Sequence, residues 1–101
     1  MTITLSDAAR ELELYIENEE WIIKPATIAI GKAHQRGDLN YDKALKYLTN
    51  RTREAARQYA LMHGGMSQGW QQMFPLSDRK ACAESILEGM LAEFRLGNYW
   101  S

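Results

Sequence analysis

The chain has 101 residues, of which 46% are hydrophobic and 25% charged, and its formal net charge at pH 7 is −1. This balance excludes disordered, collagen-like and membrane-spanning classes and allows one modest core, so residues 1–101 are predicted to form a single domain. Cys82 is the only cysteine, which excludes an intrachain disulfide and a cysteine-built zinc site. The first residues lack the basic region and apolar run of a secretory signal, so we expect a cytoplasmic protein.

The small net charge conceals an uneven distribution. Residues 1–23 hold one Arg and six acids, a net charge of −5, whereas residues 24–57 hold eight bases and three acids, a net charge of +5. Such asymmetry either steers a partner or lets the protein's own helices attract each other, and we favour the internal explanation.

A first helix is predicted to begin near residue 5. The run Thr4-Leu5-Ser6-Asp7 matches the capping-box pattern that satisfies free amides at a helix start. Apolar residues then recur at helical spacing: Leu5, Ala9, Leu12 and Ile16. A break is expected between residues 18 and 25, because helix is disfavoured before a proline. Pro25 is then expected to start a short second helix that Gly37 ends.

A third helix is predicted from the cap residue Asn40 to the glycines at 64 and 65. Its apolar stripe follows alternating steps of four and three: Tyr41, Leu45, Leu48, Thr52, Ala55, Tyr59 and Met62. Residues 66–74 are expected to form a loop containing a turn of helix. Ser77 is expected to cap a fourth helix, which Gly97 ends. The pattern predicts an all-α fold, a compact bundle of four to five helices with most of the core from the third and fourth.

A set of short runs is spread over most of the chain: Tyr15-Ile16-Glu17-Asn18, Trp21, Pro25, Ile28, Gly37, Tyr41-Asp42, Ala44, Ala55-Ala56, Tyr59, Met73-Phe74-Pro75, Arg79, Ala83 and Gly97. Together these runs resemble a family of small uncharacterised proteins encoded by tailed phages. The resemblance implies a phage or prophage origin and an accessory role inside a bacterial host. It implies no biochemical activity.

Nothing in the sequence indicates catalysis. His34 and His63 lack a metal-binding context, and histidines at helix ends more often interact with the terminal carbonyls. Cys82 is expected to be a small buried hydrophobe, because no histidine is placed to activate its thiol. We therefore expect no enzyme, no cofactor and no metal.

Three surfaces are candidates for binding. In the third helix, four cations lie opposite the apolar stripe: Lys43, Lys46, Arg53 and Arg57. They could follow a nucleic-acid backbone, although such a pattern more often marks a solvated face. Leu14 and Trp21 point away from the buried face of the first helix, so they form either a partner site or a second packed side. The segment 66–74 offers adaptable Met and aromatic side chains for docking, or else it plugs the end of the bundle: Met66, Trp70, Met73 and Phe74. We expect Trp70 to face a partner, because the neighbouring glycines indicate a surface loop.

The candidate surfaces predict a protein that binds a protein partner, and the resemblance to tailed-phage proteins implies that this is an accessory protein that modulates a host enzyme or defence complex. Nucleic-acid binding through the basic stripe of the third helix is the alternative, and a homodimer is reasonable if Leu14 and Trp21 are exposed. No membrane partner is expected, because no stretch approaches the roughly 18 uninterrupted apolar residues of a membrane span.

Overall fold

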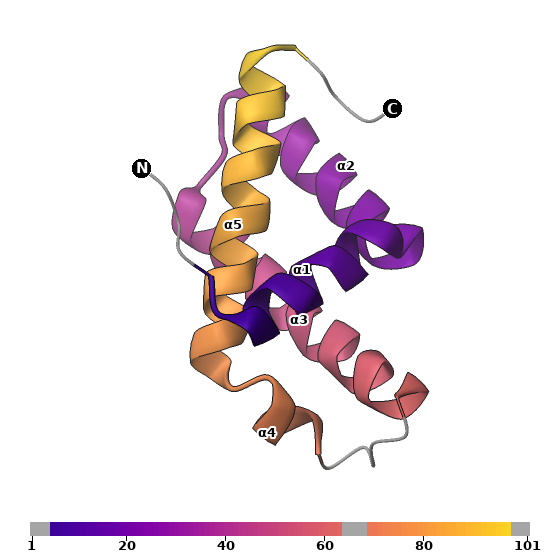
Figure 1. The fold of residues 1–101 in the computed structure, drawn as a ribbon. Helices are drawn as coiled ribbons and strands as arrows, with labels where there is room; N and C mark the ends of the chain where they lie inside the picture. The colour runs from indigo at the N-terminus through magenta and orange to yellow at the C-terminus, as the bar shows by residue number, and fades with distance from the viewer. Residues whose placement is uncertain (1–4, 64–68, 98–101) are drawn as a thin grey trace.

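The computed structural model describes residues 5–63 and 69–97. These residues form five helices and no strand, which confirms the all-α fold: α1 (Asp7–Asn18), α2 (Glu20–Arg36), α3 (Tyr41–Met62), α4 (Trp70–Met73) and α5 (Leu76–Arg95). In Figure 1, α5 runs the length of the molecule, α1 crosses in front of α3, and the short α4 lies near the start of α5. Within the described residues, no helix is both long and apolar enough to cross a bilayer.

The start of α1 is fixed by Ser6. Its hydroxyl accepts a hydrogen bond from the amide of Ala9 at 3.1 Å, so Ser6 is the N-cap and the helix begins two residues later than the predicted position. The same hydroxyl donates to the carboxylate of Asp78 at 2.9 Å, which ties the start of α1 to the start of α5.

The second helix is longer than predicted. The chain breaks at Glu19 alone, and α2 then runs for 17 residues with Pro25 inside it. The prediction that Pro25 starts the helix was wrong, because Ile22 and Ile23 are both buried and hold the first turn against the core. The predicted end is confirmed: Gly37 adopts φ 74°, the left-handed conformation that suits a residue without a side chain.

The third helix agrees with its predicted bounds, and Asn40 caps it by accepting from the amide of Lys43 at 3.0 Å. Its buried face matches the predicted stripe at Leu48, Thr52 and Ala55 but differs at the two ends. Tyr41 and Met62 are exposed, while small residues supply most of the buried face: Ala44, Leu48, Thr52, Ala55, Ala56 and Ala60. Alanines allow the neighbouring helices to approach α3 closely. Close packing therefore buries the alanines and leaves the larger residues at the ends of the stripe exposed.

The segment after α3 requires a correction. Trp70 is 6% exposed and Phe74 is 2% exposed, so both belong to the core and not to a docking loop. The single turn of α4 packs on α3, and the ring of Phe74 meets the ring of Tyr59 edge to face at 5.3 Å between centroids. Glycines do allow a loop here, but burial of large aromatic side chains stabilises this segment against the bundle. The expected turn of helix within residues 66–74 is confirmed as α4.

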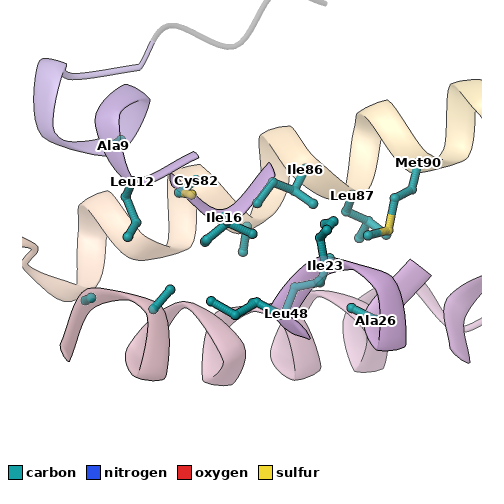
Figure 2. Packing of buried hydrophobic residues seen from close by; sticks show 14 of the residues in the cluster. Ala9, Leu12, Ile16, Ile23, Ala26, Leu48, Cys82, Ile86, Leu87 and Met90 are labelled. Atoms are coloured by element: carbon teal, nitrogen blue, oxygen red, sulfur yellow. The ribbon is translucent and has the colours of Figure 1, made fainter. Parts of the chain in front are cut away.

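The last long helix begins at Leu76 with Pro75 as its N-cap, so the predicted cap at Ser77 lies two residues too late. Six buried residues of α3 and seven of α5 confirm that these two helices provide most of the core. Figure 2 shows Leu12, Ile86 and Leu87 projecting into the space between α3 and α5. Cys82 is buried in the same cluster, as predicted, and desolvation, followed by the charges of Glu13 and Glu17, raises the pKa of its thiol to about 12.

The acidic and basic parts of the chain are not joined by ion pairs in the described residues. Two pairs there are Arg36–Asp38 at 3.3 Å and Arg51–Glu54 at 3.7 Å, and both lie within residues 24–57. α1 contacts α3 through aromatic groups instead, with the Tyr15 and Tyr59 rings edge to face at 5.5 Å. The internal attraction that the sequence led us to favour therefore has no ion pair to support it in this part of the chain.

Candidate binding surface on α2 and α3

The outer side of α2 carries an apolar strip. Trp21, Pro25 and Ile28 follow at steps of four and three and lie opposite the buried Ile23, Ala26 and Ile30. α2 is therefore apolar on two sides, and the core covers only one of them. The spacing of these three residues could have predicted the strip from the sequence. It was missed because we expected the helix to start at Pro25, which places Trp21 outside that helix.

Three neighbouring hollows extend the strip toward α3. The first lies on α2 and includes Trp21, Ile28 and Ala29. Trp21 also lines the second, together with Arg57 and Leu61 of α3. Ala29 also lines the third, which reaches Lys43 and Tyr47 of α3. Because Trp21 and Ala29 are shared, the three hollows form one continuous surface, which we call the α2–α3 surface.

Positive charge surrounds this surface. Its lining includes five cations and three acids: Lys24, Lys32, Arg36, Lys43, Arg57, Glu20, Asp38 and Glu54. Asp38 pairs with Arg36, and Glu54 pairs with Arg51. No carboxylate of the described residues lies within 4 Å of a charged nitrogen of Lys24, Lys32, Lys43 or Arg57. The apolar strip is thus bordered by four cations that remain free to attract an acidic partner.

Trp21 lies where α2 meets α3 and is 48% exposed. Its indole N–H donates to the carboxylate of Glu19 at 3.0 Å, so the polar edge of the ring is already satisfied. Leu61 lines the same hollow and is also exposed. A ring with a satisfied N–H and an uncovered apolar face is suited to anchor a partner.

The other residues predicted to face a partner do not join Trp21. Leu14 is exposed and so is not part of a second packed side, but it lies on the outer side of α1 and does not line the α2–α3 surface. Met73 is exposed on α4, while Trp70 and Phe74 are in the core. Met66 lies outside the described residues. Of the predicted set, Trp21 alone contributes to this surface within the described part of the chain.

The predicted basic stripe of α3 is exposed but is divided between two surfaces. Lys43 and Arg57 line the α2–α3 surface. Lys46 shares a hollow with Lys80 of α5, and Arg53 lies over the ring of Trp70. The four cations therefore belong to two surfaces, because α2 and α5 both pack against α3.

Acidic side chains gather in a separate cavity of about 600 Å³ between α1, α2 and α5. Glu13 and Glu17 line it beside apolar residues such as Ile86 and Met90. Partial burial, followed by the charge of Glu13, raises the pKa of Glu17. In the described residues, no group of three or more His, Cys, Asp or Glu side chains could hold a metal ion.

No family model matches the chain, and no curated protein or solved structure matches it either. The resemblance to tailed-phage proteins therefore rests on the short runs quoted above.

Proposed function

We propose that this chain is a binding protein whose α2–α3 surface receives an acidic amphipathic helix from a protein partner. The observation that supports this most strongly is the apolar strip that begins at Trp21, bordered by cations without a carboxylate partner in the described residues. Apolar anchors give such a contact its affinity, and complementary charge orients the partner and speeds its approach. The resemblance to tailed-phage proteins suggests the setting, an accessory protein in a bacterial cytoplasm that modulates a host enzyme or defence complex.

The dimensions of the surface suit a helix of about three turns. The strip from Trp21 to Lys32 spans 11 residue steps, which is about 16 Å at 1.5 Å per residue. A partner helix of this length presents apolar side chains at i, i+4 and i+7 on one side. Acidic residues beside that side would then lie near Lys24, Lys32, Lys43 and Arg57.

A designed peptide tests the proposal directly. We expect a helical peptide with Leu at i, i+4 and i+7 and flanking Glu to shift the Trp21 indole signal in a ¹⁵N-resolved NMR titration. Trp21→Ala should weaken binding by about 30-fold, because truncating a central anchor costs about 2 kcal/mol. Leu14→Ala is the matched control, since Leu14 is equally exposed but lies on α1, and it should bind like the wild type.

Capture from a bacterial lysate then identifies the natural partner. Wild type and Leu14→Ala should retain the same protein, and Trp21→Ala should lose it. The α2–α3 surface is not the binding site if Trp21→Ala retains that protein and if a scrambled version of the designed peptide shifts the Trp21 indole signal as the designed peptide does.

A further inference from the structure

Two arginines are held close together over one buried ring. The guanidinium carbons of Arg53 and Arg79 lie 5.9 Å and 5.0 Å from the centroid of the Trp70 ring. Nε of Arg79 donates to the carbonyl oxygen of Phe74 at 3.1 Å, which fixes the side chain and leaves its terminal NH₂ groups out of that bond. Desolvation and then the charge of Arg53 lower the pKa of Arg79. The Arg79 guanidinium is therefore partly removed from water and lies near a second positive charge.

Two lysines continue the positive surface. Lys46 of α3 and Lys80 of α5 line one hollow together with Asn50 and Asp42. Asp42 is near, but no carboxylate of the described residues lies within 4 Å of a charged nitrogen of Lys46, Arg53, Arg79 or Lys80. We call these four residues the α3–α5 surface. Their mutual repulsion is relieved when an anion binds among them.

We propose that the α3–α5 surface holds the phosphate backbone of a nucleic acid, at a site separate from the α2–α3 surface. Lys46 and Arg53 are seven residues apart on α3, about 10 Å along the helix. A DNA duplex presents about six phosphate charges over that length, enough to meet all four cations. Arginine is also the side chain that best matches a phosphate, with two parallel hydrogen bonds.

The geometry also indicates how selective the contact is. Trp70 is buried beneath the two guanidinium groups, so it cannot stack on a base. Binding through the four cations alone reads the backbone and not the base sequence. The surface differs from the stripe predicted on α3, because it gains Arg79 and Lys80 from α5 and excludes Lys43 and Arg57.

Fluorescence anisotropy with a labelled 24-base-pair duplex of arbitrary sequence tests the proposal. Four phosphate contacts predict that affinity falls on the order of 100-fold between 50 and 200 mM salt. The triple variant Lys46→Gln, Arg53→Gln, Lys80→Gln should retain one contact and show a fall of about 4-fold. Arg79 is left unchanged in this variant, because it packs on Trp70 and its loss could unfold the protein.

A second triple variant is the matched control. Lys24→Gln, Lys32→Gln, Lys43→Gln removes the same charge from the α2–α3 surface, so it should keep the wild-type salt dependence. Absence of duplex binding at 50 mM salt, or equal effects of the two triple variants, would overturn the proposal. The proposal would also be overturned if polyglutamate bound as tightly as the duplex and lost its affinity equally in the first triple variant. The surface would then bind acidic protein.

Discussion

Trp70 serves both the interior and the surface of the molecule. Its ring is part of the core, and the guanidinium groups of Arg53 and Arg79 lie over it. A buried aromatic ring beneath two cations contributes hydrophobic burial and cation–π attraction at the same time. The residue therefore supports the fold and positions the α3–α5 surface without touching a ligand itself.

Replacing Trp70 should destabilise the protein severely. We expect Trp70→Ala to lower the free energy of unfolding by about 3–5 kcal/mol, since it leaves a cavity between α3 and α4. Urea denaturation followed by far-UV circular dichroism measures this. Met73→Ala, at an exposed position of the same helix, should change stability by less than about 0.5 kcal/mol. A small effect of Trp70→Ala would mean that the ring is not in the core.

Trp21 shows why one tryptophan is available to a partner and another is not. Trp21 follows the break at Glu19 and points away from the buried Ile22 and Ile23. Its direction relative to those isoleucines could be predicted from helical phase, because they are its neighbours in sequence, but that no helix covers its side of α2 depends on tertiary packing. The burial of Trp70 depends on α3, whose position relative to residues 69–74 no local pattern defines.

Pro25 removes one backbone hydrogen bond from the interior of α2, the helix that carries the apolar strip. It occupies the sixth position of the helix and has no N–H, so the carbonyl of Trp21 lacks its usual partner four residues on. The helix continues through it because the turns on both sides bury isoleucines against the core. The surface strip that includes Pro25 is thus held by packing on the opposite side of α2.

Restoring the missing hydrogen bond should stabilise the helix. We expect Pro25→Ala to raise the free energy of unfolding by about 1–3 kcal/mol, because the helical gain exceeds the roughly 0.4–1 kcal/mol of added chain entropy in the unfolded state. Thermal unfolding measures the change. Lys24→Ala, an exposed neighbour that restores no bond, is the control and should have little effect. A loss of stability in Pro25→Ala would show that the ring's own contacts outweigh the missing bond.

At the scale of the whole molecule, negative and positive charges are concentrated in different parts of the chain. Residues 1–23 carry −5 and residues 24–57 carry +5, and the described residues contain no ion pair between the two segments. Leu14 lies among acids on the outer side of α1, whereas the hollows lined by Trp21 also include the cations Lys24, Lys32 and Arg57. Two copies of the chain therefore present complementary surfaces to each other, although the net charge is near zero.

Weak self-association at low salt follows from this separation. We expect light scattering to show net attraction between molecules at 10 mM salt, where charges act over about 30 Å, and its disappearance at 500 mM. Lys24→Gln, Lys32→Gln, Lys43→Gln should remove most of the attraction. A dimer that persists at 500 mM salt would instead indicate an apolar interface through Leu14 or Trp21. A monomer at every salt concentration would contradict both explanations.

The sequence by itself determined the helices of this protein and most of their ends. The cap at Asn40 and the stops at Gly37 and Gly97 act within a few residues, so the local pattern predicts them. The tertiary structure alone decided that Phe74 and Trp70 are buried, that the side of α2 opposite the core is left uncovered, and that the cations of α3 divide between two surfaces. These outcomes depend on which helices pack against one another, and those contacts join residues far apart in the sequence.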